Sequence, residues 1–373
     1  MRYRRLGRTE LQVSLLGVGC GYLAVLDRAE GERLLARALE LGINYFDGRY
    51  GDSSTKLRPL LARQRERCVV VSKTHETTAA AALRRVDEDL TELASDYIDI
   101  YLLRTYTRDM LRQHLAPGGA MEGLERARAR GKVRHVGLSG HGDLTVLAEG
   151  IASRRVDVVL FPLNVVRREA LEVLIPIAQA HDVGLAVMKP VSVGAIPAAV
   201  ALPWLANQPI HTMVPGVSCL EQLEANVTAL ERTTLSLSAA EEAEVARWRR
   251  RLDGETCRIC DEICGPVCPA GIYISGLVHH DVWFNLYRHR GLAAFLASPW
   301  APWAKQGLLA HFERRLATLE ACTHCGACEQ RCPYGLPIRT MIDGMLADHP
   351  ALIAALRERA WHDTYRDAPS PYA

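Results

Sequence analysis

Residues 69–103 read VVVSKTHETTAAAALRRVDEDLTELASDYIDIYLL, and this stretch decides the fold. It begins and ends with largely apolar runs, VVVS (69–72) and IDIYLL (98–103), which are typical of strands buried on both faces of a parallel sheet. Between the runs, apolar residues recur at the spacing of one helix face: Leu83, Val86, Leu90 and Leu93. Thr77 or Thr78 is the expected N-cap. The stretch is therefore predicted to form a strand, a helix and a second strand.

The same alternation runs through the first 230 residues. The apolar runs are LLGVG (15–19), INYF (43–46), VVVS (69–72), IDIYLL (98–103), HVGLS (135–139), DVVLF (157–161), GLAVM (184–188) and HTMVP (211–215). Eight β-α units predict an α/β fold, a TIM (β/α)8 barrel. A doubly wound sheet is the alternative, but Gly17, Gly19 and Gly21 depart from the dinucleotide fingerprint and no helix follows them immediately.

Composition excludes several classes of protein. The 45 Lys and Arg residues nearly balance the 43 Asp and Glu residues, so the net charge of +2 gives no electrostatic reason to expect nucleic acid as a partner. No segment approaches the roughly 18–20 apolar residues of a membrane helix. The N-terminal MRYRRLGRTE lacks the apolar core of a secretion signal. We therefore expect a cytoplasmic protein that binds neither nucleic acid nor membrane.

Cysteine is distributed unevenly, because eight of the 11 cysteines lie between residues 257 and 332. Clustered cysteines in a cytosolic chain indicate metal binding rather than disulfides. The second group has the ferredoxin spacing for 4Fe–4S ligands and ends in Cys-Pro: Cys322, Cys325, Cys328 and Cys332. The first group has one extra residue before its third cysteine: Cys257, Cys260, Cys264 and Cys268.

These groups predict two 4Fe–4S clusters, since the fourth cysteine of such a motif usually ligates the other cluster. The first cluster would take Cys257, Cys260, Cys264 and Cys332, and the second would take Cys322, Cys325, Cys328 and Cys268. A pair of four-cysteine zinc sites and a single cluster with spare cysteines are the alternatives. The helical insert between the groups resembles the alpha-helical ferredoxin type. We expect the barrel over residues 1–253 and an alpha-helical ferredoxin-like iron–sulfur domain over residues 254–373.

Six segments resemble, in order, the landmarks of the aldo-keto reductase family. They are MRYRRLGRTELQVSLLGVGCG (1–21), GINYFDGRYGDSS (42–54), VVVSKTH (69–75), SDYIDIYLLR (95–104), GKVRHVGLSGHG (131–142) and PGVSCLEQLEANV (215–227). The resemblance covers residues 1 to about 250. With the cysteine motifs added, the whole chain resembles the members of the family that carry a fused ferredoxin-like domain.

The resemblance implies an oxidoreductase that reduces carbonyls with NAD(P)H. Tyr50 would be the general acid, Lys73 would lower its proton affinity, and Asp47 would anchor the lysine. This agrees with elementary chemistry, because a phenol with a pKa of about 10 needs a neighbouring cation to act as an acid at neutral pH. Arg104 stands where the family has a histidine, and it would clamp a carboxylate or an oxyanion. The spacing from Asp47 to Tyr50 is two residues shorter than is usual.

The nicotinamide cofactor would be held by residues from the later strand ends and the last loop: Ser139, Asn164, Gly216, Gln222 and Asn226. Leu160 replaces the family's glutamine, and the basic residues that hold a 2′-phosphate are missing. His141 either reaches the pocket from the loop after Ser139 or is a solvated loop residue.

Three functions follow. The first is an oxidoreductase that acts on a small carbonyl or hydroxyl substrate with NAD(P)H, its clusters exchanging electrons with the site or with a partner such as ferredoxin. The second is a cluster-driven reductase that does not bind nicotinamide. The third is a non-catalytic electron-transfer or redox-sensing protein built on a barrel scaffold.

Overall fold

The computed structural model describes residues 1–48, 53–260, 263–272, 274 and 317–358. Its contacts divide the chain into two compact units. One comprises Met1–Val191 with Ala198–Ala239, and the other comprises Ser192–Pro197 with Ala240–Ala373. The two units are described separately below. The domain boundary expected between residues 253 and 254 stays a prediction.

The first unit is built on eight parallel strands, and each pairs with the next one along the chain. They are β3 (Val18–Gly19), β4 (Tyr45–Asp47), β5 (Val69–Thr74), β6 (Ile98–Arg104), β7 (Val133–Ser139), β8 (Val158–Pro162), β9 (Gly184–Met188) and β10 (Thr212–Val214). The sheet closes on itself, because Gly17 N–H donates to the Met213 carbonyl at 2.8 Å and Met213 N–H donates to the Leu15 carbonyl at 3.0 Å. The predicted (β/α)8 barrel is confirmed, with a strand in each predicted run, and the doubly wound alternative is not the fold.

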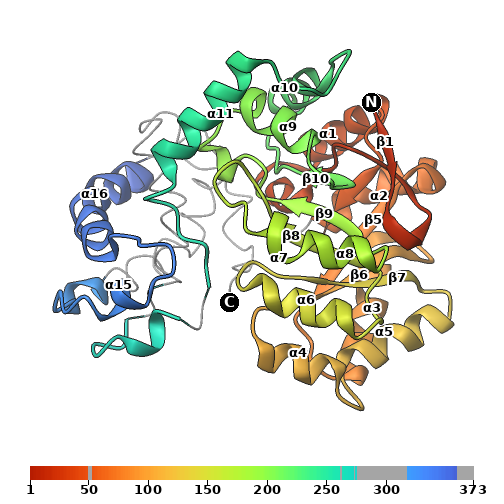
Figure 1. The fold of residues 1–373 in the computed structure, drawn as a ribbon. Coiled ribbons are helices and arrows are strands. Elements are labelled where there is room, and N and C mark those ends of the chain that lie inside the picture. Colours follow the sequence, from red (N-terminus) through yellow and green to blue (C-terminus); the bar gives the residue numbers. More distant parts are fainter. Residues whose placement is uncertain (49–52, 261–262, 273, 275–316, 359–373) are drawn as a thin grey trace. The chain divides into compact units, whose positions relative to one another are not determined.

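Helices surround the barrel (Figure 1). They are α1 (Arg28–Glu40), α2 (Ser53–Gln64), α3 (Ala79–Leu93), α4 (Arg108–Leu115), α5 (Ala120–Ala129), α6 (Leu144–Ala152), α7 (Ala170–Val173), α8 (Ile175–Ala180), α9 (Ala198–Ala206) and α10 (Leu220–Leu230). Thr78 is the N-cap of α3, and its hydroxyl accepts from Ala81 N–H at 3.4 Å.

The buried face of α3 differs from the predicted stripe. Val86 and Leu93 are buried as expected, but Leu83 and Leu90 are only half-buried, and Asp89 is buried instead. Its carboxylate accepts from the Ser72 and Tyr101 hydroxyls, each at 2.6 Å. A polar network therefore rotates the helix away from the face that hydrophobicity alone favours.

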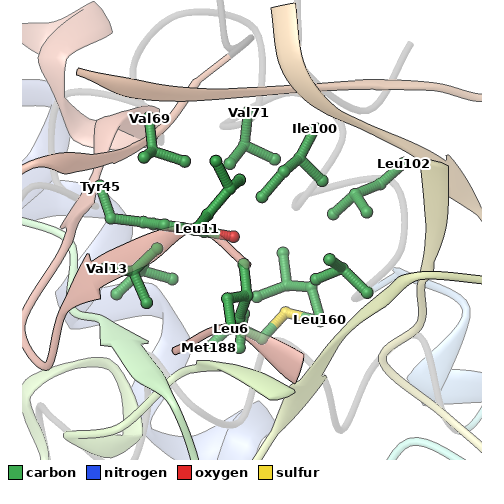
Figure 2. Close-up of a cluster of buried hydrophobic side chains, with 13 residues drawn as sticks. Leu6, Leu11, Val13, Tyr45, Val69, Val71, Ile100, Leu102, Leu160 and Met188 are labelled. Carbon is green, nitrogen blue, oxygen red and sulfur yellow. The ribbon is translucent and has the colours of Figure 1, made fainter. Parts of the chain in front are cut away.

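An N-terminal hairpin closes one end of the barrel. Strands β1 (Tyr3–Arg5) and β2 (Gln12–Ser14) pair antiparallel. Leu6, Leu11 and Val13 of this hairpin join the inward-facing strand residues in one buried cluster (Figure 2). Arg8 N–H donates at 2.6 Å to the carbonyl of Asp182, just before β9 begins, so the hairpin covers the end where the strands start. The opposite end, where the strands finish, is left for a site.

The described part of the second unit is helical. It contains α11 (Ala239–Leu252), the single turns η5 (Gly265–Val267) and η7 (Leu319–Ala321), α15 (Ala327–Arg331) and α16 (Ile338–Glu358). Helix α15 contacts both η5 and α16. None of the helices among the described residues is long and apolar enough to cross a membrane.

Candidate functional site

Strand alternation places three of the four predicted reactive residues inside the barrel. Side chains of a strand point alternately to its two faces. Tyr45 and Val71 belong to the interior cluster, so Asp47 and Lys73 face the same way two residues further on.

The next two strands extend this layer. Leu102 also belongs to the cluster, so Arg104 faces inward as well. Ser139 is paired with Arg104 across β6 and β7 and shares its orientation. Four of the predicted residues thus gather where the strands end.

Asp47 and Lys73 form a buried ion pair. Lys73 Nζ lies 2.6 Å from Asp47 Oδ1 and 2.7 Å from Oδ2. The side chains of the lysine and the aspartate are only 2% and 7% exposed. Each charge needs the other in this interior, so the pair fixes an ammonium at the barrel mouth. Tyr50, the predicted general acid, lies outside the described residues.

Arg104 is buried, and one histidine contacts its side chain while another contacts its backbone carbonyl. Its Nη1 lies 3.1 Å from His75 Nε2. Its backbone carbonyl lies 3.1 Å from Nε2 of His114, a wholly buried residue of α4. Burial lowers the pKa of His114. Because a carbonyl oxygen can only accept, Nε2–H of His114 is the donor. A guanidinium therefore stands at the end of β6, with His75 against its side chain and His114 bound to its backbone carbonyl.

A row of aromatic and basic side chains continues from Arg104. The His75 and Tyr106 ring centroids are 5.7 Å apart, and those of Tyr106 and His141 are 5.9 Å apart. Buried Arg167 donates through Nη2 to the His141 carbonyl at 2.8 Å. His75, Tyr106 and Arg167 were missed from the sequence. His75 directly follows the last residue of β5, and Tyr106 lies two residues beyond the end of β6. Including the first two residues after each predicted strand among the candidates would have found both.

The residues predicted to hold a nicotinamide cofactor are engaged mainly with their own chain. Asn164 Oδ1 accepts from the backbone N–H groups of Val166 and Arg167 at 3.0 and 2.9 Å. Its Nδ2 donates to the Lys189 carbonyl at 3.1 Å, so the Asn164 amide holds the loop that carries Arg167.

The last loop shows the same pattern. Gln222 Oε1 accepts from Ser218 N–H at 2.9 Å, and Asn226 is buried on α10. The ring of Tyr22 lies against Gly216, so closely that a Cβ there would be 1.9 Å from it. Of the five predicted residues, Ser139 lies on a strand and faces the barrel interior, and the binding of a nicotinamide cofactor by the set stays a prediction.

Four cysteines of the second unit line one pocket, which we call the cluster pocket: Cys257, Cys260, Cys264 and Cys332. With the solvent at its mouth included, the pocket encloses about 350 Å³. The set combines three cysteines of the first group with the last cysteine of the second, which is the set predicted for the first cluster. Ile259 N–H donates to Cys257 Sγ at 3.2 Å, the kind of hydrogen bond that tunes an iron–sulfur cluster.

The thiols of the cluster pocket are suited to a cationic group. Burial, and then the neighbouring thiols of Cys260 and Cys332, raise the pKa of Cys264 to about 11. Such thiols lose their protons when a cationic group binds, and iron supplies that charge. Among the residues that the structure describes, no three His, Cys, Asp or Glu side chains form a group that could hold a single metal ion.

The other four cysteines lie around α15 and the turn that it contacts. Gly326, with φ of +75°, turns the chain into α15, and the N–H of Ala327 lowers the pKa of the exposed Cys325. Cys328 is buried within that helix. Cys268 directly follows η5, the turn that contacts α15. The structure therefore brings the end of the first cysteine group to the second group.

Comparison with known proteins assigns both parts of the chain. The model of the aldo/keto reductase family matches residues 16–198, and that of the 4Fe-4S dicluster domain matches residues 256–336. The uncharacterized oxidoreductase YqkF of Bacillus subtilis is 25% identical over 211 residues, which are 52% of this chain and 66% of that protein. The chain thus spans slightly less than two thirds of that relative. L-galactose dehydrogenase of Arabidopsis thaliana is 26% identical over 280 residues, or 61% of this chain and 87% of that protein.

Solved structures agree with this assignment. An aldo-keto reductase from Bacillus halodurans in its holo form is 25% identical, with a TM-score of 0.59, over 66% of this chain and 96% of that one. A putative aldo-keto reductase from Pseudomonas aeruginosa is 30% identical, with a TM-score of 0.54, over 61% of this chain and 95% of that one. The chain therefore belongs to the aldo/keto reductase family and is an oxidoreductase with a 4Fe–4S domain C-terminal to its barrel.

Proposed function

We propose that the barrel interconverts a small carbonyl compound and its alcohol where its strands end, with Asp47, Tyr50, Lys73 and Arg104 as the reactive set. The observation that carries this proposal is the buried pair between Lys73 and Asp47, 2.6 Å apart on the inward-facing layer. A structural ion pair gains little from such burial. An ammonium held there is instead suited to tuning a proton donor.

Reducing a carbonyl to an alcohol takes two electrons and two protons, or one hydride and one proton. The Lys73 ammonium stabilises a phenolate beside it, which makes Tyr50 a stronger acid at neutral pH. Arg104 stays charged and moves no proton, so its role is to bind the substrate oxygen as negative charge develops, or to bind a carboxylate of the substrate.

Two sources of electrons fit the chain. NAD(P)H, bound through Ser139, Asn164, Gly216, Gln222 and Asn226, would supply a hydride. Alternatively, the clusters would supply electrons singly, from a redox partner such as ferredoxin. The Asn164 amide and the Gln222 side-chain oxygen favour the second source, because each already binds backbone groups of the protein.

We further propose two 4Fe–4S clusters with the ligand sets expected from the sequence. Protein purified without oxygen should then contain about eight iron and eight sulfide per chain. Cys264→Ala should remove one cluster and Cys325→Ala the other, as seen by electron paramagnetic resonance (EPR) of the reduced protein. Cys219→Ala, outside both sets, is the matched control. Zinc in place of iron, or half the expected iron with one EPR signal, contradicts the proposal.

Titration with NADH and NADPH separates the sources of electrons, with turnover of small aldehydes and 2-oxo acids as the second readout. Saturable binding, with turnover that Tyr50→Phe abolishes, identifies nicotinamide as the source. Turnover that needs reduced clusters and Tyr50, without nicotinamide binding, identifies the clusters. Tyr97→Phe is the control, because this ring lies under the Arg65 guanidinium just before β6 begins. If Tyr50→Phe and Lys73→Met both retain full turnover, the proposed acid is wrong.

A further inference from the structure

Arg258 lies between two ligand cysteines and lines the cluster pocket with them. Only 6% of this residue is exposed. Its Nη1 donates to the backbone carbonyls of Asp253, at 3.0 Å, and Thr256. Its Nη2 donates to Asp253 Oδ1. The guanidinium lies 5.0 Å from the ring centre of Tyr334, which also lines the pocket. These contacts fix a positive charge beside the four thiols.

The carboxylate that pairs with this charge is far more exposed. The Asp253 side chain is 49% exposed, whereas the Arg258 side chain is 7% exposed. Water therefore screens the negative end of the pair much more than the positive end. The carbonyls of Asp253 and Thr256 are neutral. The guanidinium and its exposed carboxylate together thus present a net positive field to the cluster pocket.

We infer that Arg258 sets the reduction potential of the cluster in this pocket, holding it more positive than the thiolates alone would. Reduction adds one electron to a cluster that four thiolates have already made anionic, and a fixed cation beside it stabilises the reduced form. An arginine guanidinium is a permanent cation, so Arg258 acts through its charge and takes up no proton itself. The inference rests on the ligand set proposed above.

A redox titration of the full-length, oxygen-free protein, followed by EPR, tests this inference. Arg258→Met should shift the midpoint of one cluster to more negative potential and leave the other unmoved. Arg258→Lys should restore most of the shift. Asp253→Asn should move the same midpoint in the opposite direction, because it removes the negative end of the pair. Arg247→Met is the control, since Arg247 is an exposed residue of α11 paired with Glu244, and it should move neither midpoint.

Opposite shifts from the two sides of one ion pair distinguish tuning from loss of structure, since damage to the pocket would move both variants in the same direction. Iron analysis of each variant shows whether its cluster is retained. If Arg258→Met does not retain iron, Asp253→Asn still decides the matter. Unmoved midpoints in every variant that retains iron overturn the inference. Parent protein with half the expected iron contradicts the two-cluster proposal instead, and the remaining signal is then tested in the same way.

Discussion

Asp47→Asn should strongly destabilise the barrel, although it leaves the size of the side chain unchanged. The carboxylate lies 2.6 Å from a lysine that is 2% exposed, so removing its charge leaves an ammonium in the interior without its anion. Breaking a buried pair on one side costs about 3–5 kcal/mol. The double variant Asp47→Asn with Lys73→Met removes both charges. It should recover most of that loss, because no unpaired charge is then left in the interior.

Hydrogen exchange of β6 in the full-length protein measures this cost. Core strands exchange only through global opening of the barrel, whereas the two units need not unfold together. The matched control is Asp87→Asn, which breaks the pair between Asp87 and Lys132, whose side chains are 49% and 32% exposed. This variant should lose less than about 1 kcal/mol. If Asp47→Asn loses no more than the control, or if the double variant is no more stable than Asp47→Asn, the pair does not act as two mutually compensating buried charges.

Three further variants test the barrel interior. Tyr45→Phe should leave stability unchanged or raise it by up to about 1 kcal/mol in thermal unfolding, because its buried hydroxyl has no hydrogen-bond partner among the described residues; a clear loss would reveal a bond that the structure does not show. Burial lowers the pKa of His211 from 6.5 to about 4, and its Nδ1 accepts from Leu185 N–H. As the pH falls, His211 therefore binds a proton in the unfolded chain before it does so in the folded one. The free energy of unfolding should fall from pH 6.5 to pH 4 by about 2 kcal/mol more than in His211→Asn, allowing for partial exposure. Equal pH profiles for the two proteins would contradict this. Gly137→Ala should cost about 3 kcal/mol or more, because the new Cβ would lie 2.0 Å from the Val158 carbonyl oxygen, which belongs to the sheet; near-parental stability would show that β7 and β8 separate easily.

The strands could be predicted from the sequence because their signal is local. A strand buried on both faces must be apolar throughout, and the runs at 98–103 and 184–188 meet that requirement without reference to the rest of the chain. The face of α3 could not be predicted in the same way. Asp89 pairs with Arg85 one turn earlier on the helix, and hydroxyls from β5 and β6 also bind it; those two hydroxyls cannot be identified from the helix sequence.

In the candidate site too, residues on the strands could be predicted and residues beyond the strand ends could not. The family resemblance pointed to Asp47, Lys73 and Arg104, and their inward direction follows because side chains alternate regularly along a strand up to its last residue. Beyond that residue the alternation ends, so nothing in the sequence indicates that His75 turns toward Arg104.

The cysteine region shows the same difference between local sequence signals and packing between distant segments. Ligands two or three residues apart are constrained by the short chain between them. This spacing grouped Cys257, Cys260 and Cys264, and the usual exchange of the fourth cysteine between two such motifs added Cys332, which lines the same pocket. The charge of Arg258 is as visible in the sequence as those cysteines, but its burial is not. That burial depends on Asp253 behind it and on the ring of Tyr334, which comes from the far side of the insert. Spacing therefore predicts which atoms hold a cluster, whereas the residues that set its potential are determined by packing between distant segments.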